Sequence, residues 1–538
     1  MRAISLFFLS IITVGASAQG VRKPRLVVNV VVSQLRYDDL VRYGDKFTEG
    51  GFNRFLREGM TFTESEYDYM QTTTPAGLAT LTTGANPSAH GVVNAGWYDY
   101  VNNKPVSLAD DPSVSGLECD AGVGRYSPLH VVVPTLGDRL KEESPRSKVV
   151  TVASDPVSAV VMGGQTSDVY WMDTTRCTWI SSTAYMRTLP DWVVRYNGQR
   201  LADTYLDYEW KLLNHRESYR NESYSVIDFE PESRFKKIAA LGFLRRKEIS
   251  RDYARIPHTP TGITLVKDFA KQAVIYEDLG KDEHADLLNI CFDTPRYIGS
   301  AFGGGSMERE DMLYRMDTEL ADLLDFIYAQ VPEKDVLVVL TSDHGVSDPF
   351  DAGARPRERF NAAQFRVIVN GFLCAQYGSG EWVVGYRDRQ LYLNRTLIYS
   401  QNLSLEEVQN RTAAFALQFR GVSHALTATA LSGGSFAEGY GKRMQNSFYP
   451  KRSGDVLINL MPGWIEEDEQ ARALSGSLYD YDTHVPLMWL GAGIPACRVR
   501  APADMRDVAP TLARILRITR PVASEGKPIE ALVSLLEE

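Results

Sequence analysis

Cysteine is scarce in this sequence of 538 residues, which contains only five. The cysteines are far apart and odd in number, so they form neither a paired-cysteine metal site nor a dense disulfide framework. One or two disulfides remain open, and the spacing selects no pairing among the five, which are Cys119, Cys177, Cys291, Cys374 and Cys497.

Positive charge is also in deficit, because 58 Lys and Arg residues face 68 Asp and Glu residues for a formal net charge of −10. This balance disfavours non-specific binding to nucleic acid or to an anionic membrane, although a local basic pocket can still hold an anion. No apolar run approaches the ~18 residues of a membrane-spanning helix. We therefore expect no nucleic-acid partner and no transmembrane segment. The composition, 44% hydrophobic and 23% charged, excludes disorder, collagen and coiled coil.

The N-terminus has the three parts of a secretory signal peptide. Arg2 supplies the positive start, Ile4–Val14 the apolar stretch, and Ala16-Ser17-Ala18 the small residues of a cleavage site. We predict a signal peptide over residues 1–18 and a mature chain that begins near Gln19. The protein is then exported to the periplasm, the outer membrane or the extracellular space.

Short apolar runs rich in β-branched residues recur along the chain and predict the fold class. Runs that are apolar on both faces are typical of a parallel sheet covered by helices. We expect an α/β fold with a mostly parallel central sheet, formed by Leu26–Val32, Lys148–Val152, Leu287–Phe292, Val336–Leu340 and Val485–Leu490. Helical spacing appears between and after the runs, for example at Asp507–Leu516.

Two long stretches differ in composition from the rest and are rich in Tyr, Trp, Arg and Asn. We predict that they are insertions that cap one α/β domain over residues 19–538. The insertions span roughly residues 166–284 and 351–475, and the core spans roughly residues 24–165, 285–350 and 476–520.

Polar residues follow several of the predicted strands. Ser33 follows the first run, Asp293 follows LLNICF, and the sequence TSDHG at Thr341–Gly345 follows VLVVL. Ligands of open α/β sheets bind beyond the carboxyl ends of the strands, so these residues predict one site. Asp343 and His344 are a carboxylate and an imidazole suited to one divalent metal. Thr74 before Pro75 is typical of a helix start, and a hydroxyl there also lies where a phosphoryl group is favoured.

An ordered set of motifs makes the chain resemble a known superfamily. The motifs include VVSQLRYDDL, TTTPAGLATLTTGANPSAHG, YIGSAFGGGSMEREDMLYRMD, TSDHGV, GSLYDYDTHVPLMWLGAGI and DVAPTLARIL. In this order and spacing the chain resembles the alkaline phosphatase superfamily, close to its exported bacterial phosphatase and type I phosphodiesterase/nucleotide pyrophosphatase branch. The resemblance runs from Val28 to Leu516.

The resemblance implies a two-zinc hydrolase with a Thr or Ser nucleophile, in which the two ions activate the nucleophile and neutralise developing charge. Residues of this chain match four of the ten family positions. Thr74 matches the nucleophile, Asp343 and His344 match ligands of one zinc, and His484 matches a ligand of the other.

Six positions are substituted, and these substitutions affect the chemistry directly. Where the family has metal ligands this chain has Ser33, Arg296 and Ser300, and where the family holds the phosphate with Asn, Lys and Arg it has Ala95, Asp155 and Val157. A fixed cation at Arg296 repels a divalent ion, and Asp155 repels a dianion. The nearby acids Asp38, Asp39 and Asp293 are candidates for a rebuilt ligand set, but their places in the sequence favour caps or surface.

These substitutions favour a pseudoenzyme that binds an anionic small molecule or a protein partner of the cell envelope. With them we expect no zinc, or at most one ion. The alternative is an active phosphoric ester hydrolase that uses Thr74 with a single or rearranged metal site and prefers singly charged esters. A structural or assembly subunit is a third hypothesis, which differs from the first only in what the insertions bind.

Overall fold

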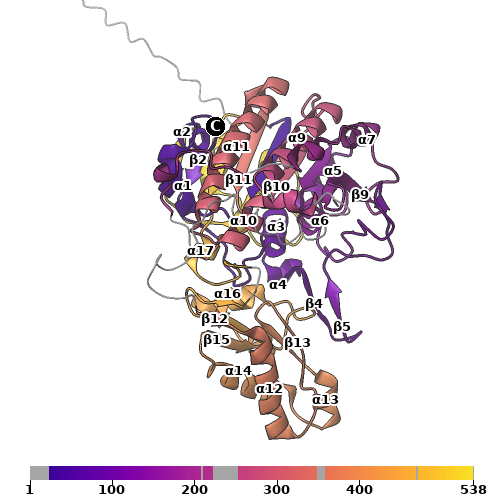
Figure 1. Cartoon of the computed structure of the whole chain (residues 1–538), viewed down its shortest axis with the longest axis vertical. Coiled ribbons are helices and arrows are strands. Elements are labelled where there is room, and N and C mark those ends of the chain that lie inside the picture. The colour runs from indigo at the N-terminus through magenta and orange to yellow at the C-terminus, as the bar shows by residue number, and fades with distance from the viewer. Residues whose placement is uncertain (1–22, 207–209, 222–252, 348–357, 468–470, 537–538) are drawn as a thin grey trace, which may run out of the picture.

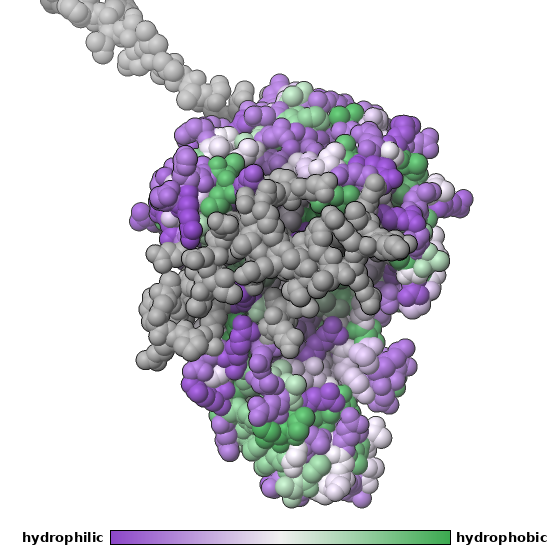
Figure 2. Space-filling view, in the orientation of Figure 1, coloured by the Kyte–Doolittle hydropathy of each residue, from purple (hydrophilic) through white to green (hydrophobic). Residues whose placement is uncertain are grey.

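The computed structural model describes residues 23–206, 210–221, 253–347, 358–467 and 471–536. The predicted signal peptide, residues 1–18, lies outside this part of the chain. None of the helices in the described ranges has the length and apolarity needed to cross a membrane. Figure 1 shows a large body of helices and strands, with a smaller sheet and its helices at one end. In the same orientation, Figure 2 shows hydrophilic and hydrophobic residues interspersed over this face of both bodies.

The large body contains a ten-stranded sheet in which five neighbouring strands are parallel. In sheet order these are β11 (Val336–Thr341), β1 (Leu26–Val32), β10 (Asp286–Phe292), β7 (Val149–Ala153) and β8 (Asp168–Asp173). Shorter strands extend both edges, namely β18 (Leu487–Gly491), β2 (Met60–Phe62) and β19 (Cys497–Val499) beyond β11, and β9 (Thr178–Ser182) and β6 (Gly116–Leu117) beyond β8. The predicted α/β class with a mostly parallel central sheet is confirmed.

The last apolar run differs from the others in direction. It forms β18, which is antiparallel to β11 and pairs Leu487 with Thr341 at the carboxyl end of that strand. The chain reaches β18 from the loops at this end of the sheet, so β18 has to run back along β11. The direction of a strand depends on where its preceding segment ends, which an apolar run alone does not encode.

Polar side chains inside the central strands align three of them. Asn29 of β1 donates from Nδ2 to Asn289 Oδ1 of β10 at 3.0 Å, and Asn289 donates from Nδ2 to Thr151 Oγ1 of β7 at 3.1 Å. The same strands pair Asn29 with Asn289 and Asn289 with Thr151 in the backbone register. Asn289 and Thr151 are buried, so each needs the partner that this register provides.

Helices cover both faces of the sheet, as the alternation of side chains along a strand requires. The even-numbered residues of β1 pack with α9 (Thr261–Tyr276) and α11 (Met307–Gln330). Val27 and Val31 pack on the other face with α3 (Thr74–Thr83), α6 (Pro156–Gly163), α5 (Leu136–Glu143) and α18 (Val508–Leu516). Shorter helices include α1 (Tyr37–Tyr43), α2 (Phe52–Glu58), α4 (Pro87–His90), α7 (Asp191–Gly198), α10 (Thr294–Phe302) and α17 (Asp480–Thr483).

The smaller body contains a four-stranded sheet that lies within residues 351–475. Its strands, in sheet order, are β13 (Val383–Arg387), β14 (Gln390–Leu393), β16 (Val456–Leu460) and β15 (Val422–Thr427). They pack with α12 (Ala362–Tyr377) and α14 (Leu405–Ala416) around a core of their own. The other predicted insertion, residues 166–284, contributes β8, β9 and α9 to the large body. A hairpin of β4 (Gly96–Asp99) and β5 (Lys104–Ser107) reaches toward the smaller body (Figure 1).

Candidate functional site

The register of the parallel strands brings the predicted site residues to one edge of the sheet. Val32 of β1 pairs with Phe292 of β10, and Val31 pairs with Thr341 of β11. The residues that follow these strands therefore start from adjacent positions. They are Ser33, Asp293 and the segment that contains Asp343 and His344, and all of them are buried.

Thr74 is held against this edge by the close approach of α3. The helix begins at Thr74, which is buried, and Pro75 follows within its first turn. Gly77 lies so near the end of β11 that a Cβ at this position would be 2.0 Å from the carbonyl oxygen of Asp343. Only glycine lets the helix pack this closely, and the contact brings the Thr74 hydroxyl to the end of the strand.

Thr74 and His344 are hydrogen-bonded, and the direction of the bond follows from the other ring nitrogen. His344 Nδ1 is 2.6 Å from the carbonyl oxygen of Gly345, which can only accept, so Nδ1 carries the proton. In the neutral imidazole Nε2 is then an acceptor, and it lies 3.1 Å from Thr74 Oγ1. When His344 is neutral, the Thr74 hydroxyl is therefore the donor and Nε2 the acceptor.

Asp343 is ionised by its surroundings. Ser33 donates its hydroxyl to Oδ2 at 2.7 Å, and the backbone N–H groups of Gln34 and His344 donate to Oδ1 at 3.2 and 2.9 Å. Burial raises the pKa of this carboxyl, but the positive charge that His344 carries when protonated and the donated hydrogen bonds outweigh burial and hold the pKa below its ordinary value. Ser33 thus supports the carboxylate as a donor and supplies no second charge to it.

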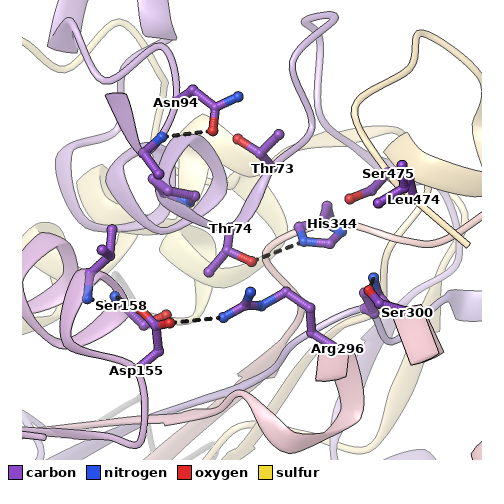
Figure 3. A pocket seen from close by; sticks show the side chains of 14 residues that line it. Thr73, Thr74, Asn94, Asp155, Ser158, Arg296, Ser300, His344, Leu474 and Ser475 are labelled. Carbon is purple, nitrogen blue, oxygen red and sulfur yellow. Dashed lines mark hydrogen bonds and ion pairs between the residues drawn. The ribbon is translucent and has the colours of Figure 1, made fainter. Parts of the chain in front are cut away.

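A cavity of about 240 Å³ opens beside Thr74 (Figure 3). Seven of the ten residues chosen from the sequence line it, namely Thr74, Ala95, Asp155, Val157, Arg296, Ser300 and His344. Ser33 lies directly behind Thr74, with the two hydroxyl oxygens 3.5 Å apart, and it donates to Asp343, which lies behind His344. Residues from segments that are far apart in the chain thus line one cavity.

Arg296 crosses one side of the cavity and pairs with two carboxylates. Its Nη2 lies 3.4 Å from Asp155 Oδ2 and 3.3 Å from Asp293 Oδ1, and its guanidinium lies over the ring of Tyr297. Burial and the Asp155 carboxylate raise the pKa of Asp293 to about 6, although Arg296 opposes this rise. A fixed cation and its acidic partners thus occupy the side where the resemblance implies a metal ligand.

His484 does not join the other predicted metal ligands. Its Nε2 lies 2.9 Å from the carbonyl oxygen of Thr63, and its ring stacks on Tyr37 with centroids 5.1 Å apart. Nε2 must therefore carry a proton and donate it, and His484 is not among the residues that line the cavity.

Of the nearby acids, Asp39 and Asp293 are held by other partners, and Asp38 is exposed in the first turn of α1. Asp39 is paired with Arg36 and Arg309, at 2.8 and 2.5 Å. Asp293 accepts hydrogen bonds from Ser154 and Ser158 as well as from Arg296. In the described ranges no group of three or more His, Cys, Asp or Glu side chains is placed to hold a metal ion. The residues present therefore do not fit the two-zinc site that the resemblance implies.

Asn94 is a residue of the cavity that the sequence motifs did not predict. Its side chain lines the cavity and is only 6% exposed. The alignment of motifs assigned the family's Asn position to Ala95, yet an amide stands one residue earlier in the chain. The adjacent Asn was the available signal, but which of the two neighbours faces a cavity depends on the local backbone. Thr73, Leu474 and Ser475 also line the cavity without having been predicted.

Comparison with known proteins decides the family. The model of the type I phosphodiesterase/nucleotide pyrophosphatase family matches residues 27–479. The chain belongs to this family. It is thereby a member of the alkaline phosphatase superfamily, as the motifs implied.

Relatives of this phosphodiesterase-family chain match it along nearly its whole length. It is 30% identical over 528 residues to a protein of Myroides odoratus named calcium-transporting ATPase, covering 96% of each. It is 29% identical to alkaline phosphatase PafA of Elizabethkingia meningoseptica, covering 95% of each. The crystal structure of wild-type PafA matches with a TM-score of 0.86 at 28% identity, over 95% of this chain and 99% of that one. Murine ectonucleotide pyrophosphatase/phosphodiesterase 5, with a TM-score of 0.52 and 12% identity over 92% of this chain and 95% of that one, shares the fold.

Proposed function

We propose that this member of the phosphodiesterase family binds an anionic ester in the cavity beside Thr74 and is impaired in metal-dependent hydrolysis. The observation that supports this proposal is the ion-paired Arg296. A divalent ion on this side of the cavity would face a guanidinium that already satisfies Asp155 and Asp293. Removing that cation would leave two buried or partly buried carboxylates without their partner.

The second support is the number of ligands on the other side of the cavity. Asp343 and His344 remain there, but the third place is Ser33, whose hydroxyl donates to the Asp343 carboxylate. Structural and catalytic zinc sites use three or four protein ligands, and carboxylates supply the charge that offsets the ion. Two ligands beside a hydroxyl donor give a weaker site.

We place a small molecule ahead of a protein partner as the occupant. The site is a cavity of about 240 Å³, which admits one chemical group of an ester. We also propose that the protein acts in the cell envelope after export. N-terminal sequencing of the exported protein should find a chain that begins near Gln19.

Hydrolysis and zinc content test the proposed impairment together. We expect purified protein supplied with zinc to leave 4-nitrophenyl phosphate and bis(4-nitrophenyl) phosphate intact. We expect a variant with Ser33→Asp, Arg296→Asp and Ser300→His to gain zinc in elemental analysis, because it restores three ligands. Zinc-dependent hydrolysis by the wild-type protein that Thr74→Ala abolishes would contradict the proposal.

A second candidate function is favoured by the Thr74–His344 hydrogen bond. A hydroxyl that donates to an imidazole nitrogen at 3.1 Å is arranged as a nucleophile beside a base. The alternative proposal is therefore residual hydrolysis of phosphoric esters through Thr74. It requires activity that Thr74→Ala removes and that His344→Gln lowers by a similar factor, since the two groups would act as a unit.

A further inference from the structure

Three helices begin at the cavity, and two of them have an acid at their start. Asp155 caps α6 by accepting hydrogen bonds from the N–H groups of Val157 and Ser158, and Asp293 is the residue before α10. The third helix, α3, has Thr73 as its cap residue and no acid in its first turn. The positive end of the α3 dipole therefore meets no carboxylate of its own. An anion is the charge that this helix start favours.

Asn94 provides a second, independent indication of a ligand. Its Oδ1 accepts a hydrogen bond from the N–H of Ala95 at 2.7 Å, which fixes the orientation of the amide. The Nδ2 group is buried and has no partner in the part of the chain that the structure describes. A buried donor without a partner is destabilising by about 1–3 kcal/mol, so native structures rarely leave one. An acceptor atom of a bound molecule would complete it.

Three more groups of the cavity wall lack partners among the described residues, namely Arg296 Nε, Thr73 Oγ1 and Gln34 Oε1. Arg296 Nε is a donor and the Thr73 hydroxyl can donate, whereas Gln34 Oε1 can only accept. Figure 3 shows that Asn94 and Thr73 lie on one side of Thr74, with Arg296 and Asp155 on the other. Donors thus stand on both sides of the hydroxyl, which suits a compact group with several acceptor oxygens, such as a tetrahedral oxyanion.

The carboxylates limit how much negative charge this group can carry. Arg296 is the cation of the cavity wall, and its charge is already shared between Asp155 and Asp293. The Asp155 carboxylate itself lines the cavity, and the ionised Asp343 lies behind His344. A second negative charge on the ligand would meet these carboxylates without a further cation to offset it.

We propose that the cavity binds, without a metal ion, a tetrahedral ester group that carries one negative charge. Its oxygens would accept hydrogen bonds from Asn94 Nδ2, Arg296 Nε and the start of α3. A sulfate monoester and a phosphate diester share this chemistry, whereas a phosphate monoester, doubly charged above its second pKa of about 6, does not. This inference rests on the proposed function and names its ligand class.

Calorimetric titrations at pH 8 in the presence of EDTA test the charge rule with three probes of similar shape. The probes are phenyl sulfate, methyl phenyl phosphate and phenyl phosphate, of which only the last is doubly charged. We expect phenyl sulfate, methyl phenyl phosphate or both to bind at least about tenfold more tightly than phenyl phosphate. Comparing the two singly charged probes then tells sulfate from phosphate ligands.

Two variants test the groups, and one serves as a matched control. Asn94→Ala should weaken binding of the preferred probe about tenfold, through the loss of one hydrogen bond to a charged group. Asn102→Ala changes an exposed Asn of the β4–β5 turn and should leave the affinity for that probe unchanged. Asp155→Asn retains a good helix cap and removes the negative charge. It should therefore reduce the ratio between the affinity for the preferred singly charged probe and the affinity for phenyl phosphate.

The outcomes separate this inference from the proposed function. Equal or tighter binding of phenyl phosphate would overturn the charge rule while leaving a ligand-binding protein. Binding that requires zinc, or that Asn94→Ala does not weaken, would overturn the metal-free site. If the folded protein binds none of the probes, then both the inference and the ligand-binding function fail. Thermal unfolding of each variant establishes that it is folded.

Discussion

Replacing Gly77 with alanine is the sharpest test of how Thr74 is positioned. The new Cβ would lie 2.0 Å from the Asp343 carbonyl oxygen, 2.7 Å from the carbonyl carbon and 2.9 Å from Cα. A Cβ atom essentially never lies within 3.0 Å of such a neighbour, so α3 and the segment after β11 would have to part by about 1 Å. All three neighbouring atoms belong to the backbone, which no side-chain rotation can move away.

The consequence for the site follows from the distances. The Thr74–His344 hydrogen bond is 3.1 Å long, and a displacement of about 1 Å would take it beyond the range of a hydrogen bond. We expect Gly77→Ala to lower the free energy of unfolding by about 1–3 kcal/mol through overpacking, although alanine favours helices over glycine. It should also weaken binding of an anion at the start of α3. Urea unfolding and calorimetric titration measure the two effects.

Gly371 supplies the matched control. It also lies inside a helix, α12, but a Cβ there would meet no atom within 4 Å. Gly371→Ala should therefore raise the free energy of unfolding by about 0.5–1 kcal/mol. If Gly77→Ala proves as stabilising as Gly371→Ala, then the close approach of α3 to β11 does not hold Thr74 in place.

Three further predictions concern groups around the site. Burial lowers the pKa of His90 to about 3, so protonation favours the unfolded chain, and the free energy of unfolding decreases as the pH falls from about 6.5 toward 3. Urea unfolding at pH 5 should show a loss of about 2 kcal/mol, which the variant His90→Gln should not show. Arg309→Gln should lower the free energy of unfolding by about 3–5 kcal/mol, because it leaves the buried Asp39 carboxylate with one partner fewer. Arg309→Lys should recover only part of this lost free energy. Arg389 donates to the carbonyl oxygens of Gly476 and Ser475, so Arg389→Gln should accelerate hydrogen exchange in residues 474–477 about tenfold, whereas unchanged exchange would contradict this tether.

The sequence predicted the main sheet and the location of the cavity because both depend on local patterns. Apolar runs such as Leu26–Val32 indicate strands that are buried on both faces, and a polar residue after each run marks the carboxyl end. Parallel strands place those ends together, so residues as far apart as Ser33 and Asp343 could be assigned to one site. Motif order supplied Thr74, whose distance from His344 is then fixed by the packing of α3.

Local sequence patterns could not predict the side-chain contacts that depend on distant segments. His484 stands in the motif of a metal ligand, but its donation to the Thr63 carbonyl depends on how β2 and the following loop pass it. Asn94 and Ala95 are neighbours, and only the backbone conformation decides that the Asn94 amide lines the cavity. Arg389 belongs to the smaller body and tethers a loop of the cavity wall. Its two acceptors, on Ser475 and Gly476, lie 86 and 87 residues later in the chain.

The asparagine ladder inside the central sheet bears on how the site can form during folding. A slip of one residue between β1 and β10 would shift the end of β1 by about 3.3 Å and turn its side chains to the opposite face. It would also separate Asn29 from Asn289 and leave the buried Asn289 without its partner on β1. Strands made almost wholly of valine, leucine and isoleucine offer little else to distinguish such misaligned pairings. Hydrogen bonds some four residues away from Ser33 therefore help select the single alignment in which the ends of three strands meet around one cavity.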